Sequence, residues 1–136
     1  MQKYFFIKTN GKYLKIYFDE IAFVEGCRNY IKIETENKSY LVLITMKRME
    51  QLLSVAMFRR IHKSFIVSLD KIIQFDSERV YLKDKELPIG QLYKGELEKS
   101  LMIVDDTSEV PGETNLLYKM PLLIKANQRN RLSEAG

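Results

Sequence analysis

Arg60, His62 and Ser64 are the side chains whose types and spacing point most directly to chemistry. They recur at every second position of the segment 58–68, and residues two apart on an extended strand point to the same face. A guanidinium can hold a phosphate through two parallel hydrogen bonds, and an imidazole and a hydroxyl can add others. Arg59 and Lys63 add positive charge beside this row. The pattern favours an anion-binding surface, with a solvated strand edge as the alternative, because such charges also protect edges from pairing.

Two further segments carry side chains that could bind a polyanion. Arg28, Asn29 and Tyr30 are consecutive and offer a cation, an amide that can bond adenine at two points, and an aromatic ring. The segment 88–94 is a strand-to-helix turn whose backbone N–H groups, together with Lys94, can approach a phosphate. For both segments the plainer interpretation is a simple turn. In the first segment, Asn29 would be a turn residue that tolerates positive φ.

The counts of cysteine and histidine exclude several classes of enzyme and metal site. The chain has one of each, Cys27 and His62, so it cannot build a zinc site from these residues or an internal disulfide. No G-x-S-x-G elbow accompanies Ser64, and neither glycine-rich phosphate-binding motif is present. We therefore expect a protein that is not an enzyme and needs no cofactor.

The charge is distributed unevenly along the 136 residues. Residues 1–104 carry 18 Lys and Arg against 13 Asp and Glu, whereas residues 105–136 carry 4 against 5. The acidic, turn-rich stretch 105–114 is typical of a linker. We expect one domain over 1–104, followed by a linker and a flexible tail over 105–136. No apolar run is long enough to span a membrane, and nothing marks a secretory signal, so we expect a cytoplasmic protein.

Periodicity predicts short strands with two short helices. Asn10-Gly11 predicts a two-residue type I′ turn between strands at 4–8 and 13–17. Thr45 is placed to cap a helix whose apolar positions begin at Met46, and a second helix is predicted over 91–102. Further strands are predicted over 21–25, 30–35, 39–44, 58–69, 71–75, 79–83 and 86–89.

The order of these pieces resembles the LytTR DNA-binding domain of bacterial response regulators over about residues 3–102. The most specific piece is Arg60-x-His62-Lys63-Ser64-Phe65-Ile66-Val67. The other pieces are Asp19-Glu20-Ile21-x-Phe23-x-Glu25, Asn29-Tyr30, Thr45-Met46-Lys47-x-Met49, and Leu87-Pro88-Ile89-Gly90 followed by Tyr93.

This resemblance implies a mostly β fold, with about ten short antiparallel strands and short helices, that binds DNA without a recognition helix. By analogy, the loop Arg28-Asn29-Tyr30 enters one major groove, the turn after Pro88 enters another, and His62-Lys63-Ser64 lie between them. Family members often carry an arginine in the turn after the proline, which this chain lacks. Gln91 could read adenine instead, or Lys94 could hold a phosphate, so the target sequence cannot be transferred.

Two functions remain open from the sequence. The first is a transcription regulator without its own receiver domain that binds double-stranded promoter DNA sequence-specifically, alone or as two copies on adjacent sites. The second is an interaction module that inhibits a DNA-binding partner, with the apolar segment 116–124 of the tail as the docking element.

Overall fold

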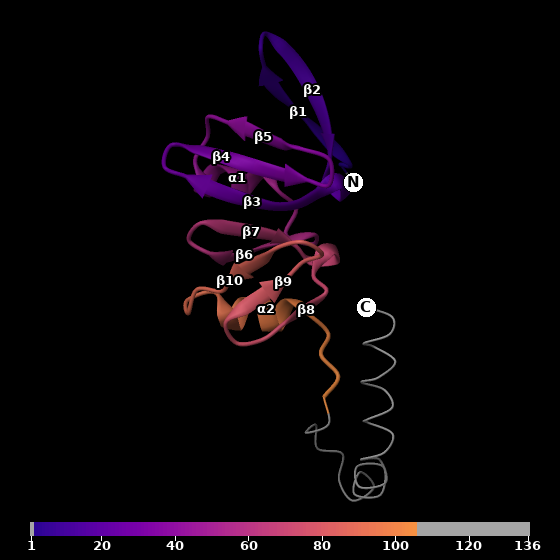
Figure 1. The fold of residues 1–136 in the computed structure, drawn as a ribbon, viewed down its shortest axis with the longest axis vertical. Helices are drawn as coiled ribbons and strands as arrows, with labels where there is room; N and C mark the ends of the chain where they lie inside the picture. Colours follow the sequence, from indigo (N-terminus) through magenta and orange to yellow (C-terminus); the bar gives the residue numbers. More distant parts are fainter. Residues whose placement is uncertain (1, 106–136) are drawn as a thin grey trace, which may run out of the picture. The chain divides into compact units, whose positions relative to one another are not determined.

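The computed structural model describes residues 2–105, which form ten strands, two α-helices and two 3-10 turns (Figure 1). The expected mostly β fold with short helices is confirmed. The strands are β1 Tyr4–Thr9, β2 Lys12–Tyr17, β3 Ile21–Cys27, β4 Tyr30–Thr35, β5 Ser39–Val42, β6 Phe58–His62, β7 Phe65–Ser68, β8 Gln74–Phe75, β9 Arg79–Tyr81 and β10 Glu86–Pro88. The helices are α1 Met46–Leu52 and α2 Lys94–Ser100, and the 3-10 turns are η1 Phe18–Glu20 and η2 Leu69–Lys71.

A hairpin of β1 and β2 begins the fold as a separate two-stranded sheet. Its turn has φ of 50° at Asn10 and 73° at Gly11, as the predicted type I′ turn requires. Phe5, Ile7, Leu14 and Ile16 alternate along one face of the hairpin, and that face packs toward the centre of the domain.

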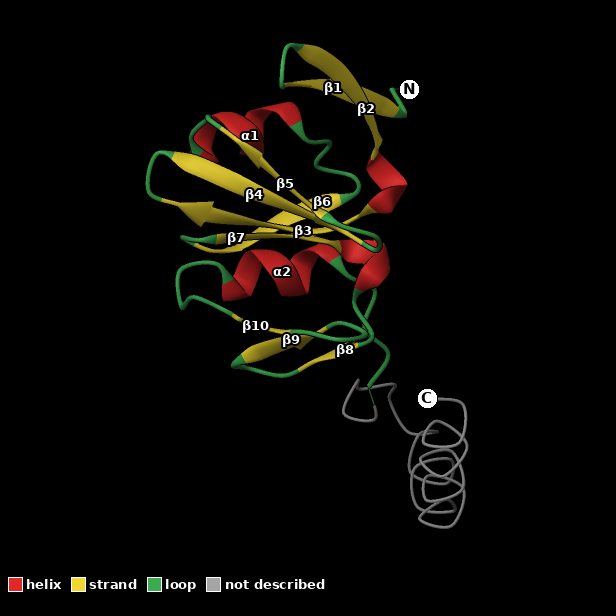
Figure 2. Ribbon diagram, turned by 45° about the horizontal axis from the view of Figure 1, so that its top comes forward, coloured by secondary structure: helices red, strands yellow, loops and turns green. Residues whose placement is uncertain are grey.

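The centre of the domain is a five-stranded antiparallel sheet in the order β5-β4-β3-β7-β6. Helix α1 covers one face and α2 the other (Figure 2). The inner strands carry apolar side chains on both faces, as at Phe23 with Val24 and at Ile66 with Val67. This explains why their sequences lack a clean alternation, whereas in β4 buried Ile31 and Ile33 alternate with Tyr30 and other more exposed residues.

The sheet separates two apolar cores. The first lies under the hairpin and α1, and its buried members are Ile7, Ile16, Phe18, Ile21, Val24, Ile31, Ile33, Met49, Leu53, Phe58 and Ile66. The second lies under α2 and the small sheet β10-β9-β8, and its buried members are Phe23, Ile61, Val67, Val80, Leu82, Leu87 and Leu97.

Three predicted elements differ clearly from the structure. The strand predicted over 71–75 is confined to β8 at Gln74–Phe75, because Lys71 ends the 3-10 turn η2. The strand predicted over 58–69 is two strands, β6 and β7, joined by a turn at Lys63-Ser64. The helix predicted over 91–102 is confined to α2, because residues 91–93 form a turn before it. The Thr45 cap is confirmed, since its hydroxyl accepts a hydrogen bond from the Arg48 amide at 3.1 Å.

Contacts divide the chain after Leu101 into two units. Of the second unit the structure describes only residues 102–105. Apart from Asp105, the expected linker, the flexible tail and the docking segment 116–124 lie outside the described residues, so the domain limit near residue 104 stays a prediction.

Candidate nucleic-acid interface

Three turns from distant parts of the sequence meet at one end of the five-stranded sheet. The Gly26 amide, just before the β3–β4 turn, donates to the carbonyl of Ser64 in the β6–β7 turn at 2.8 Å. The Gly90 amide, after β10, donates to the Ile61 carbonyl at 2.7 Å. Both views show the three turns on the same side of the domain (Figures 1 and 2). Main-chain hydrogen bonds therefore bring together the three segments that the sequence singled out.

The first turn consists of Arg28 and Asn29 between β3 and β4. Arg28, Asn29 and Tyr30 are all exposed. The positive φ of this turn, 58°, falls on Arg28 and not on Asn29. Asn29 is thus a turn residue, as the plainer interpretation predicts, but it does not adopt the positive φ.

The second turn changes the expected arrangement of Arg60, His62 and Ser64. The pairing of β6 with β7 shifts between Arg60 and His62, so Arg60 lies opposite Ile66 and His62 lies opposite Phe65. Ile66 belongs to the first core, whereas Phe65 packs against the second. Arg60 and His62 thus point to opposite faces of the sheet, and the prediction of one row on one strand face is wrong.

His62 and Ser64 stabilise the turn that contains them. The Ser64 amide donates to Nδ1 of His62 at 3.0 Å, and the His62 ring lies 5.7 Å from the ring of Phe65. Both residues are half-buried, while Lys63 at the tip of the turn is exposed. Lys63 therefore carries the accessible charge of this turn.

The Arg60 guanidinium is largely occupied within the domain. It donates to the carbonyls of His62 at 3.2 Å and Lys63 at 2.5 Å, and it pairs with the Glu50 carboxylate at 3.0 Å. It also lies 5.8 Å from the ring centre of Tyr93, and its side chain is only 17% exposed. These contacts make Arg60 the residue that joins α1, the second turn and the third turn.

Arg59 is also held inside the domain. Its guanidinium donates to Oγ of Ser100 at the end of α2 and to the carbonyl of Val55. The guanidinium of Arg59, which the sequence suggested as extra charge for anion binding, therefore attaches β6 to the end of α2 and to the segment before β6.

The third turn, residues 89–93, presents exposed Gln91 and Leu92. Its shape is held by a hydrogen bond from the Tyr93 amide to the Gly90 carbonyl at 2.9 Å. Leu92 is 91% exposed, so its side chain is available for contact with a ligand. Lys94 is half-buried at the first position of α2.

The start of α1 also reaches this end of the sheet, which the sequence did not reveal. A side chain at Gly26 would place its Cβ 2.5 Å from Cγ of Met46, so glycine permits the first residue of α1 to approach the first turn. Lys47 and Arg48 follow Met46 and are exposed. The Thr45 cap was the signal that could have placed these two cations, since it marks where α1 begins.

A family model for the LytTr DNA-binding domain matches residues 11–102, more than half of the chain. The chain belongs to the LytTr DNA-binding domain family. Among solved structures it is similar to the LytTr DNA-binding domain of a methyl-accepting/DNA response regulator from Bacillus cereus, with 20% identity and a TM-score of 0.65. That alignment covers 76% of this chain and 100% of that chain. A comparison with curated protein sequences gives no match.

Membership of the LytTr family confirms the resemblance seen in the sequence. It supports DNA binding by a transcription regulator as the role of the domain, with DNA as its partner. The matched range includes all three turns and α1 but excludes strand β1, which ends at Thr9.

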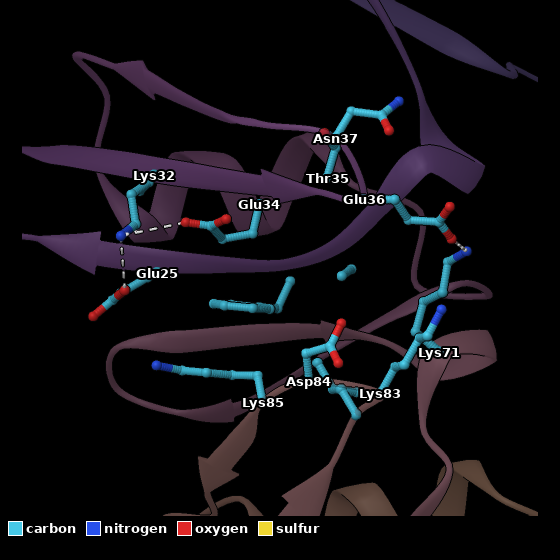
Figure 3. A pocket seen from close by; sticks show the side chains of 13 residues that line it. Glu25, Lys32, Glu34, Thr35, Glu36, Asn37, Lys71, Lys83, Asp84 and Lys85 are labelled. Carbon is cyan, nitrogen blue, oxygen red and sulfur yellow. Dashed lines mark hydrogen bonds and ion pairs between the residues drawn. The ribbon is translucent and has the colours of Figure 1, made fainter. Parts of the chain in front are cut away.

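A pocket of about 580 Å³ lies elsewhere on the LytTr domain, between β3 and β4 on one side and the β9–β10 turn on the other (Figure 3). Its charged lining residues are four acids and four lysines: Glu25, Glu34, Glu36, Asp84, Lys32, Lys71, Lys83 and Lys85. Such a balanced lining does not favour a phosphate.

Hydrogen-bonded ion pairs occupy part of that lining. The hydrogen bond from Lys32 to Glu34 raises the pKa of the Lys32 ammonium, and Glu25 adds to this effect. The hydrogen bond from Lys71 lowers the pKa of the Glu36 carboxyl. Much of the charge in the pocket is therefore already paired, in contrast to exposed Arg28 and Lys63 at the three turns.

Residues 2–105 contain no group of three or more His, Cys, Asp and Glu side chains that could hold a metal ion. Within the same part of the LytTr domain, no helix has the length and apolar character needed to cross a bilayer.

Proposed function

We propose that this LytTr domain binds double-stranded promoter DNA sequence-specifically through the end of the sheet where the three turns meet. The observation that supports this most is the pair of main-chain hydrogen bonds, Gly26 to Ser64 and Gly90 to Ile61, that gathers the turns. Exposed cations and exposed amides thereby share one surface. Phosphate contacts would orient the domain, and contacts to base edges would select the sequence.

The turns divide these two roles between them. Arg28, Lys63 and the α1 cations Lys47 and Arg48 supply exposed positive charge for the phosphate backbone. Asn29 can bond adenine at two points from one turn. Tyr30 lies next to Asn29. His62 and Ser64 maintain the shape of the second turn, which would lie between the two major grooves that the first and third turns enter.

The third turn reads bases without the arginine common in the family. Gln91 can bond the same adenine edge as asparagine, and exposed Leu92 can contact the methyl group of thymine. Lys94, half-buried behind them, is placed for a phosphate. A turn with an amide and an apolar side chain favours an A·T pair at the site that it contacts.

Selection of bound duplexes from a random pool, followed by affinity measurements across salt concentrations, tests the proposal. We expect Lys63→Ala to reduce the slope of log K against log salt by about 0.9, because one phosphate contact is lost. Asn29→Ala is expected to lower the preference for the selected duplex over a scrambled one by about tenfold or more, since a two-point contact to a base contributes about 1–3 kcal/mol.

Lys38→Ala is the matched control, because Lys38 is an exposed cation beyond the opposite end of β4. It should leave both the slope and the preference unchanged. Equal losses in Lys63→Ala and Lys38→Ala would mean that the net charge attracts DNA without a defined surface. Failure to select any duplex would contradict the proposal outright.

A further inference from the structure

The hairpin β1–β2 has a second face that the DNA-binding end does not use. One face, with Phe5, Ile7, Leu14 and Ile16, belongs to the first core. Side chains alternate between faces along a strand, so the intervening residues form the outer face. The outer face consists of Tyr4, Phe6, Lys8, Tyr13, Lys15 and Tyr17.

Four of these six outer-face side chains are aromatic and stand in solvent. Their exposed fractions are 41% for Tyr4, 53% for Phe6, 69% for Tyr13 and 43% for Tyr17. Tyr4 meets Phe6 and Tyr17 edge to face, with interplanar angles of 87° and 71°. A concentrated patch of exposed apolar side chains of this kind marks a binding surface.

The lysines of the outer face lie among the rings. Nζ of Lys15 is 4.5 Å from the ring centre of Tyr4, 5.6 Å from that of Phe6 and 5.7 Å from that of Tyr17. Nζ of Lys8 lies 5.8 Å from the ring centre of Tyr13. Residues 2–17 contain four lysines and no aspartate or glutamate. The hairpin therefore attracts polyanions and repels a second copy of itself.

Flat rings interleaved with lysines fit a single nucleic-acid strand better than a duplex. In a duplex the bases stack on one another and only their edges reach the grooves, so protein rings on a sheet cannot stack on them. Bases of a single strand are free to stack on aromatic side chains, while lysines follow the phosphates.

We propose that the outer face of the β1–β2 hairpin is a binding site for single-stranded DNA or RNA, separate from the three turns. Strand β1, which supplies Tyr4, Phe6 and Lys8, lies outside the residues matched by the family model. Strand β2, which supplies Tyr13, Lys15 and Tyr17, lies within those residues. The site does not depend on the proposed duplex interface.

The test measures binding of the full chain to fluorescein-labelled 12-nucleotide oligomers, one DNA and one RNA, by anisotropy. We expect Phe6→Leu, which keeps an apolar side chain but removes the ring, to weaken binding about tenfold. Tyr4→Leu should act in the same way. Circular dichroism of each variant checks that the hairpin remains folded. A preference between the two oligomers identifies which nucleic acid is the ligand.

Lys15→Gln and Lys12→Gln form a matched pair of charge variants. Each variant removes one lysine from β2. Lys15 lies on the outer face, whereas Lys12 lies on the same face of the strand as Leu14 and Ile16. Lys15→Gln should weaken binding and reduce the salt slope by about 0.7, the value for one phosphate of a single strand. Lys12→Gln should leave both unchanged. This pair tests the site even where an aromatic variant fails to fold.

Duplex binding separates this site from the three turns. Phe6→Leu should leave affinity for the selected duplex unchanged, and Asn29→Ala should leave affinity for the single strand unchanged. The proposal is overturned if Asn29→Ala abolishes single-strand binding or if neither oligomer binds at micromolar concentration. It is also overturned if an acidic peptide binds the outer face in place of both oligomers, or if Phe6→Leu abolishes only self-association.

Discussion

Arg60 illustrates how a residue with the chemistry of a ligand-binding group can be used to hold a structure. Two main-chain carbonyls, a carboxylate and a ring surround its guanidinium. A planar group with five N–H donors can satisfy these partners together, whereas an ammonium cannot. We therefore assign Arg60 to positioning the Lys63-Ser64 turn.

This assignment predicts different effects for two substitutions. Arg60→Lys keeps the charge but loses the shared hydrogen bonds, so we expect duplex affinity to fall about tenfold with an unchanged salt slope. Arg60→Ala should also leave the slope unchanged, in contrast to Lys63→Ala. Anisotropy titrations at several salt concentrations measure both quantities. Normal binding by Arg60→Lys, with a slope reduced by about 0.9 in Arg60→Ala, would identify Arg60 as a phosphate contact instead.

At the scale of elements, the β1–β2 hairpin depends on a turn that few residues can adopt. Gly11 has a φ of 73°, where a side chain costs about 1–2 kcal/mol. We expect Gly11→Ala to lower the free energy of unfolding by about 1 kcal/mol, or the melting temperature by about 4–8 °C, as measured by thermal denaturation.

Gly95→Ala is the control for this substitution. Gly95 lies in α2, and an added Cβ would meet no atom within 4 Å. The same change should therefore stabilise the domain there, by about 0.5 kcal/mol, because it reduces the entropy of the unfolded chain. Destabilisation by both variants to the same extent would show that turn geometry is not the cause.

The two hairpin turns also show what the sequence could and could not reveal. Asn10-Gly11 tolerates positive φ, and the turn was predicted from that pair alone. The turn at Lys63-Ser64 contains neither glycine, proline, asparagine nor aspartate, so no local signal interrupts the apparent strand. It is stabilised by hydrogen bonds of His62 and Arg60. The types and spacing of the residues in the sequence do not predict these hydrogen bonds.

The same limit applies to the interface. The side chains of Asn29, Lys63 and Gln91 were predicted as candidates from their chemistry and from the family resemblance, and their roles stay predictions. That their three turns meet depends on main-chain hydrogen bonds between segments about 30 residues or more apart, such as Gly26 to Ser64. The contribution of α1 was missed because it depends on close approach at Gly26.

At the scale of the whole domain, the five-stranded sheet joins two cores that have no buried residue in common. Adjacent residues of one strand serve different cores, as Ile66 and Val67 do in β7. Loss of packing in one core would therefore detach a strand whose other side chains pack in the second core. We infer that the two cores unfold as one cooperative unit.

A matched pair of substitutions tests this cooperativity. Ile33→Val acts on the first core and Ile61→Val on the second, and both residues are fully buried. Each change should lower the free energy of unfolding by about 1 kcal/mol. Urea denaturation followed by far-UV circular dichroism and by tyrosine fluorescence should give coincident curves for both variants. Ile73→Val, at an exposed position, should have little effect, and a biphasic curve for Ile61→Val would show that the cores unfold separately.

The hydrogen bonds that gather the three turns involve no side chain. Their donors and acceptors are the main-chain atoms of Gly26, Gly90, Ser64 and Ile61. Exposed residues at 29, 63 and 91–92 can therefore be exchanged without loosening the scaffold that presents them, whereas the positive φ of Arg28 restricts the residues that fit there. The domain is thus a suitable template for libraries randomised at these positions, from which variants with new operator preferences can be selected.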